Sequence, residues 1–105
     1  MIRHLLLLTL RDDVTQEDLE GISAGFDALA REIPEIAGLQ HGAALQLPGS
    51  SAQPADYAVA LDFENEEAFA RYIDHPIHRE FVRTRLLPVR TGGMSAQIRI
   101  QDGRS

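Results

Sequence analysis

The chain has 105 residues, which fits one domain, and its 44% hydrophobic and 25% charged residues are typical of a globular protein. No apolar run approaches the length of a membrane span, and the formal net charge of −6 disfavours nucleic acid and anionic membranes as partners. Cysteine is absent, which excludes disulfides and thiolate chemistry and is compatible with the cytoplasmic location that we expect.

The first half of the chain predicts a strand, a helix and a second strand. Residues 2–10 read IRHLLLLTL, and both alternating sets are apolar at the centre, which indicates a strand buried on both faces. Thr15 is placed to cap a helix over 16–33, in which apolar residues recur at helical spacing. A turn at 37–38 then precedes a strand expected at 39–47.

The second half predicts two further strands around a broken helix. The strand at 56–63 alternates cleanly between apolar and polar or small residues. The helix is broken at 75–76, because the residue before a proline avoids the helical region. The expected segments are a polar loop at 48–54, a strand at 56–63, a helix from 66 capped by Asn65, a break at 75–76, a helical stretch to about Leu86, a glycine turn at 92–93 and a strand at 94–100.

The resulting order, β-α-β-β-α-β, predicts an α+β domain of the ferredoxin-like class, with an antiparallel sheet and helices on one face. We expect the domain to span 1–101 and residues 102–105 to form a frayed tail. Helices cover only one face, yet the first strand is apolar on both and the third carries Ala58 and Ala60 on its second face. Such a patch usually marks an interface, so the sequence favours a homodimer through the sheet face over a monomer.

The richest chemical feature is the segment from Tyr72 to His78. If the chain reverses at its central proline, the Tyr72 and His78 side chains approach one cavity, where a neutral histidine can take a proton and a tyrosine hydroxyl can donate to an oxyanion. His4 could line that cavity. The alternative is structural: Tyr72 in the core, His75 as a cap and His4 as a buried, hydrogen-bonded histidine. Spacing supports no metal site, and we expect no cofactor.

The sequence resembles the stress-responsive A/B barrel (Dabb) family of dimeric α/β barrels. The residues that carry the resemblance are Ile2-Arg3-His4 before an apolar strand, Ile33-Pro34, Asp62-Phe63-Glu64, the Tyr72–His78 segment and Phe81-Val82. The resemblance covers nearly the whole chain and extends to a polyketide cyclase of that family, olivetolic acid cyclase. Tyr57 stands where that cyclase would have a further pocket histidine.

The resemblance implies two alternative functions. The first is a cofactor-independent, cyclase-like enzyme acting by intramolecular aldol chemistry on a ketone-bearing small molecule, with His78 as general base and Tyr72 stabilising the enolate. The second is a non-catalytic stress-response or small-ligand-binding protein. An open cavity lined by both side chains would favour chemistry. The substrate pocket implied by the resemblance is lined by His4, Leu6, Tyr57, Val59 and His75.

Overall fold

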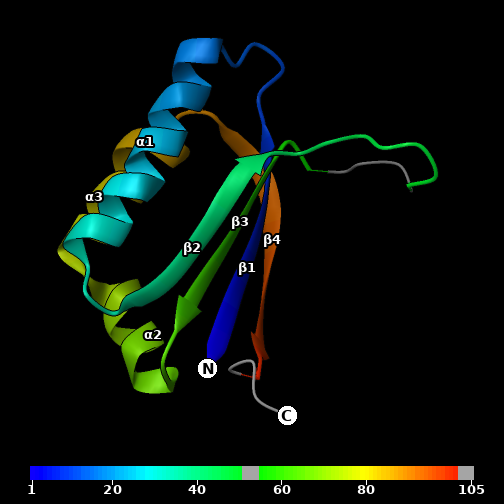
Figure 1. The fold of residues 1–105 in the computed structure, drawn as a ribbon. Coiled ribbons are helices and arrows are strands. Elements are labelled where there is room, and N and C mark those ends of the chain that lie inside the picture. The colour runs from blue at the N-terminus through cyan, green and yellow to red at the C-terminus, as the bar shows by residue number, and fades with distance from the viewer. Residues whose placement is uncertain (51–54, 102–105) are drawn as a thin grey trace.

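The computed structural model describes residues 1–50 and 55–101 and has the ferredoxin-like arrangement that the sequence predicts (Figure 1). No helix in these two ranges is both long and apolar enough to cross a membrane. The elements are β1 (Ile2–Leu10), α1 (Gln16–Glu32), β2 (Ile36–Ala43), β3 (Tyr57–Phe63), α2 (Glu66–Asp74), α3 (Pro76–Phe81), the π-helical turn η1 (Val82–Leu86) and β4 (Arg90–Arg99).

The four strands form one antiparallel sheet in the order β2-β3-β1-β4, with the helices on one side of it (Figure 1). Side chains alternate across a strand, so β1 sends Ile2, His4 and Leu8 into the core beneath the helices, where all three are buried. Leu5 and Leu7 point to the opposite side, which no helix covers. We call this side the open face of the sheet.

Local sequence explains where the helices begin. The Thr15 hydroxyl accepts a hydrogen bond from the Asp18 N–H, and the Asp18 carboxylate accepts one from the Thr15 N–H, both at 3.0 Å. This reciprocal capping box satisfies two N–H groups that the first helical turn cannot pair. The Asn65 side chain accepts from the Ala68 N–H at 2.9 Å and starts α2 in the same way. Both predicted caps are therefore confirmed.

The core lies between the helices and the sheet. A close approach between α1 and α3 shapes it: a Cβ added at Gly25 would overlap the Phe81 ring, so glycine is required there. The Phe81 ring packs edge-on against Phe26 with centroids 4.8 Å apart. The side chains that are most completely buried are Tyr72, Phe26, Phe63, Leu8, Ile22, Leu29, Ile33 and Leu61.

Two predicted boundaries are wrong. The second strand occupies Ile36–Ala43 and not 39–47, because pairing with β3 begins at Ile36 and a bulge before Gly38 absorbs the expected turn. Residues 92–93 belong to β4 and form no turn, because both glycines continue the ladder with β1. A Cβ at Gly93 would collide with the Leu7 carbonyl oxygen, which explains the glycine. Residues 51–54 of the predicted loop and the tail 102–105 lie outside the described residues.

Candidate functional site

The break between α2 and α3 builds the candidate site. The chain leaves the helical region at His75, whose φ and ψ are −68° and 133°, and Pro76 opens α3. The His75 Nδ1 accepts a hydrogen bond from the Ile77 N–H at 3.1 Å and so caps the new helix. This ring nitrogen has a structural task, as the alternative interpretation of the sequence expected. The predicted place of His75 in a substrate pocket stays a prediction.

The break brings the Tyr72 and His78 side chains into contact. Their ring centroids lie 4.4 Å apart with the planes inclined by 45°. Tyr72 is 2% exposed and also packs on Phe63, with centroids 5.0 Å apart. The His78 Nδ1 lies 3.1 Å from the backbone oxygen of Ile73. A carbonyl oxygen can only accept, so Nδ1 carries the proton and the lone pair of His78 is on Nε2.

His4 completes this group from the middle of β1. The side chain is 7% exposed, its ring packs on Phe69 with centroids 5.3 Å apart, and its Nδ1 lies 2.8 Å from the Nε2 of Gln97 on β4. The Phe69 ring packs in turn on Phe63, which packs on Tyr72, with centroids 5.5 and 5.0 Å apart. The structure therefore brings Tyr72 and His78 into contact and links His4 to them through two aromatic rings.

Burial sets the protonation of the group. Burial lowers the pKa of His4. It also lowers the pKa of His78, because its effect is larger than that of the hydrogen bond to Ile73, which raises this pKa. Burial also raises the pKa of the Tyr72 hydroxyl. Near pH 7, both histidines are therefore neutral and the tyrosine keeps its proton. The set can accept one proton and donate hydrogen bonds, which is the minimum that acid–base chemistry requires.

Tyr57 lies away from this group. In the β1 register, His4 pairs with Leu61 and Leu8 pairs with Tyr57, four residues further along the sheet. At the rise of a β-strand, this separates the levels of His4 and Tyr57 by about 13 Å. Leu6 and Val59 pair between those two levels. The four predicted pocket residues on the sheet thus form a row beneath the helices, and His4 lies at the end that is linked to Tyr72 through Phe69 and Phe63.

The structure contains a second polar group that sequence reasoning missed. The His41 Nδ1 lies 2.7 Å from the Tyr57 hydroxyl, and its Nε2 lies 2.7 Å from a carboxylate oxygen of Asp27. Both ring nitrogens are occupied, and the chain of bonds ties α1 to β2 and β3. Asp27 and Tyr57 flank His41 at distances of 14 and 16 residues in sequence, so no local pattern signals this network.

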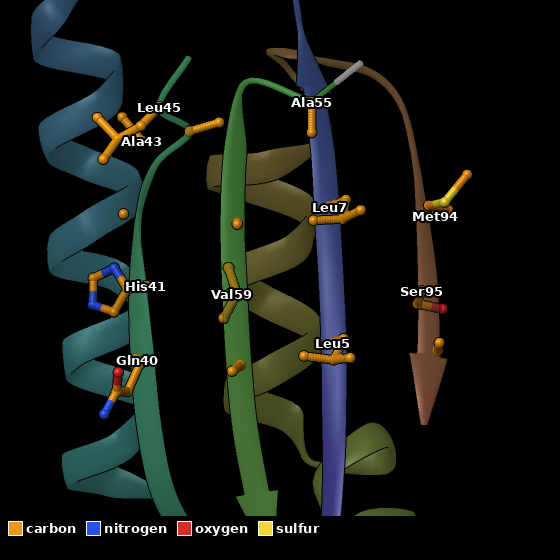
Figure 2. A pocket seen from close by; sticks show the side chains of 15 residues that line it. Leu5, Leu7, Gln40, His41, Ala43, Leu45, Ala55, Val59, Met94 and Ser95 are labelled. Carbon is orange, nitrogen blue, oxygen red and sulfur yellow. The ribbon is translucent and has the colours of Figure 1, made fainter. Parts of the chain in front are cut away.

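Hollows of different size mark the described part of the surface. One of about 620 Å³ covers the open face, where Leu5 and Leu7 of β1 lie between β3 and Met94 of β4 (Figure 2). One of about 610 Å³ lies between α1 and α3. One of about 350 Å³ is lined by Phe69 and Gln97, the two side chains that contact His4. Neither Tyr72 nor His78 lines any of the three.

No cluster of three or more metal-ligating side chains (His, Asp or Glu) occurs within residues 1–50 and 55–101. The basic side chains near the site serve other partners. Arg79 pairs with Asp74 at 2.9 Å and Arg83 pairs with Glu80 at 2.7 Å, all of them exposed. Exposed pairs of this kind contribute little to stability and mark a solvated helix surface.

A four-stranded antiparallel sheet covered by helices on one face defines the class of this protein as a ferredoxin-like α+β domain. Residues 2–98 match the family described as the Stress responsive A/B Barrel Domain, and the chain belongs to this family. It is 30% identical over 80 residues to a stress-response A/B barrel domain-containing protein of Arabidopsis thaliana, covering 76% of this chain and 72% of that protein.

Solved structures share the fold closely. A dimeric ferredoxin-like protein of unknown function from Thermobifida fusca is 31% identical, with a TM-score of 0.80 over 94% of this chain and 90% of that one. A hydroxynitrile lyase from Passiflora edulis is 19% identical, with a TM-score of 0.84 over 99% of this chain and 96% of that one. The family resemblance and the fold expected from the sequence are thus confirmed.

Proposed function

We propose that this chain is a cofactor-independent acid–base enzyme that acts, as a homodimer, on a small ketone-bearing molecule. The observation that carries the proposal is the contact between Tyr72 and His78, which pairs a hydroxyl donor with an imidazole whose Nε2 lone pair is free of the bond to Ile73. The lowered pKa of His78 and the raised pKa of Tyr72 keep the base unprotonated and the donor protonated near neutral pH.

The proposed reaction is an intramolecular aldol addition of the cyclase type. The His78 Nε2 takes a proton from the carbon next to a carbonyl, the C–H electron pair becomes the C=C bond of the enolate, and the carbonyl π pair moves to oxygen. The Tyr72 hydroxyl donates a hydrogen bond to that oxygen. The enolate carbon then attacks a second carbonyl carbon of the substrate, and the new alkoxide recovers the proton from His78. No electron acceptor is needed.

The fold is compatible with enzyme activity, since one protein that shares it is a hydroxynitrile lyase. At 19% identity, that likeness concerns the fold alone. The activity proposed here therefore rests on the side chains of this chain, and the cyclase-like reaction rests on the family resemblance of the Tyr72–His78 segment.

The homodimer part of the proposal rests on the open face. Exposed apolar side chains gather there. Leu7 is 36% and Met94 67% exposed at the hollow of about 620 Å³ (Figure 2), and Ile98, 46% exposed, lies further along β4. The chain after β2 leaves the sheet on the side away from the helices (Figure 1) and exposes Leu45 by 68%. A second copy would bury these surfaces. The similar protein from Thermobifida fusca is described as dimeric.

A second candidate function is non-catalytic binding of a small ligand, with the Tyr72–His78 segment serving the fold. The burial of Tyr72, 2% exposed, favours this candidate, as does the absence of Tyr72 and His78 from the linings of the three hollows. The hollow of about 350 Å³ is lined by Phe69 and Gln97, which contact His4, but not by Tyr72 or His78. The two candidates differ in whether the His78 imidazole exchanges a proton with a bound ketone.

The test measures that exchange directly. The full-length protein is incubated with poly-β-keto thioesters in D₂O, and both deuterium uptake next to the carbonyl and cyclised product are followed. His78→Ala should lower the rate of each by about 100-fold or more. His41→Asn, which removes an imidazole elsewhere in the sheet, is the matched control and should retain the rate. Unchanged exchange in His78→Ala would remove His78 as the base and leave the binding function.

A further inference from the structure

The two histidines of the candidate site are held in opposite tautomers by different partners. The Gln97 side-chain nitrogen lies 2.8 Å from the His4 Nδ1. An amide nitrogen only donates, so Nδ1 of His4 is the acceptor and the ring proton is on Nε2. In His78, the Ile73 carbonyl oxygen imposes the reverse, with the proton on Nδ1 and the lone pair on Nε2. The remaining nitrogen of His4 is a donor, and that of His78 is an acceptor.

The register of the sheet makes the Gln97 contact specific. His4 and Gln97 face each other across β1 and β4, although they are 93 residues apart in sequence. Cross-strand neighbours on one face lie within side-chain reach, so the Gln97 amide is placed to contact the His4 imidazole. Phe69 packs on the same imidazole from α2 and limits its rotation. Contacts from two elements thus hold the orientation of the ring, and the hydrogen bond at Nδ1 sets the tautomer.

We propose that Gln97 is a positioning residue that holds His4 as a hydrogen-bond donor to the oxygen of a bound carbonyl compound. The inference rests on the proposed function and narrows its substrate class. With Tyr72, the site offers two donors and, at His78, one acceptor. Two hydrogen-bond donors stabilise an oxygen that carries negative charge, so the site favours the enolate of a 1,3-dicarbonyl compound over its neutral keto form. The site therefore selects compounds that form an enolate.

The first experiment reads the tautomer of His4 by NMR of the ¹⁵N-labelled histidine side chains at neutral pH, with no substrate present. The wild type should show an unprotonated Nδ1 and a protonated Nε2 on His4. In Gln97→Glu the carboxylate can only accept, so the proton should move to Nδ1. In Gln97→Met, which keeps the apolar stem and removes the amide, the preference for Nε2–H should weaken. Gln101→Glu, at an exposed position, is the matched control and should leave the spectrum of His4 unchanged.

The second experiment uses acetylacetone, a small 1,3-diketone, as the probe, and follows its enolate absorbance on titration with the protein. The wild type and Gln101→Glu should bind it as the enolate. Gln97→Glu should bind it at least about tenfold more weakly, because the donor at His4 becomes an acceptor facing an anion. The affinity of Gln97→Met for the enolate should lie between those of the wild type and Gln97→Glu. This variant also tests the inference if Gln97→Glu fails to fold.

The outcomes separate this inference from the proposed function. A wild-type His4 protonated on Nδ1, or equal enolate binding in all Gln97 variants, overturns the positioning role. Enolate binding that depends on Gln97, together with unchanged proton exchange in His78→Ala, supports the donor at His4 and contradicts only the base assigned to His78.

Discussion

The rings of Tyr72 and His78 lie 4.4 Å apart, on opposite sides of the break between α2 and α3. Neither residue could reach the other in this way along one regular helix, because residues six apart point to different faces. Pro76 ends α2 and redirects the chain, so that a position in the second helix faces back onto the first. The chemistry proposed for this chain depends on that local reversal.

Removal of one oxygen atom tests the role of the tyrosine. Tyr72→Phe keeps the ring that packs on Phe63 and His78 and deletes the hydroxyl. If the hydroxyl stabilises an oxyanion, kcat on a poly-β-keto thioester should fall by about 100-fold. Urea unfolding, measured alongside, should stay within about 1 kcal/mol of the wild type, since the packing is retained. A variant with wild-type kcat would show that Tyr72 serves the core alone.

The buried histidines predict how stability depends on pH. The folded pKa values of His4 and His78 lie below the ordinary 6.5, so the unfolded chain binds protons more tightly. Their contribution to the free energy of unfolding is complete above about pH 6.5 and is lost as the pH falls through 6.5 toward the folded values. Between about pH 7.5 and 5.5, the wild type should lose more stability than His78→Gln, measured by urea unfolding at each pH. An equal loss in both proteins would contradict the burial argument.

The contact between α1 and α3 predicts opposite effects for two glycines of one helix. Gly25→Ala would drive a methyl group into the Phe81 ring and should destabilise the protein by about 1–3 kcal/mol. At Gly21 the nearest atom to an added Cβ is an Arg85 nitrogen at 3.5 Å, an ordinary contact. Gly21→Ala should therefore stabilise α1 by up to about 1 kcal/mol. Phe81→Leu combined with Gly25→Ala should recover part of the loss, which urea unfolding of the double variant measures.

A charge on the open face tests the homodimer. Leu7→Asp would bury a carboxylate between two sheets and should produce a species of 11.6 kDa in sedimentation, against twice that mass for the wild type. Leu87→Asp, at a residue that is 56% exposed and outside the sheet, is the matched control and should leave the mass unchanged. A wild-type protein that sediments at 11.6 kDa at every concentration would rule out the dimer.

Local sequence determined the elements of this protein and the site segment. Several features depend on residues within a few positions of one another, so a local sequence pattern predicts them. They are the strand at 2–10, the caps at Thr15 and Asn65, and the break before Pro76. The same is true of Tyr72 and His78, which a short reversal brings together.

Only the tertiary structure decided which partners His4 and His41 have. The Gln97 amide reaches His4, and Tyr57 reaches His41, through the register of paired strands, and the partners are 93 and 16 positions apart in sequence. The glycines at 92–93 signal a turn by composition, yet strand pairing with β1 draws them into the ladder. β1 and β4 lie at opposite ends of the chain, so no turn joins them and no local pattern pairs His4 with Gln97; the assembled sheet does.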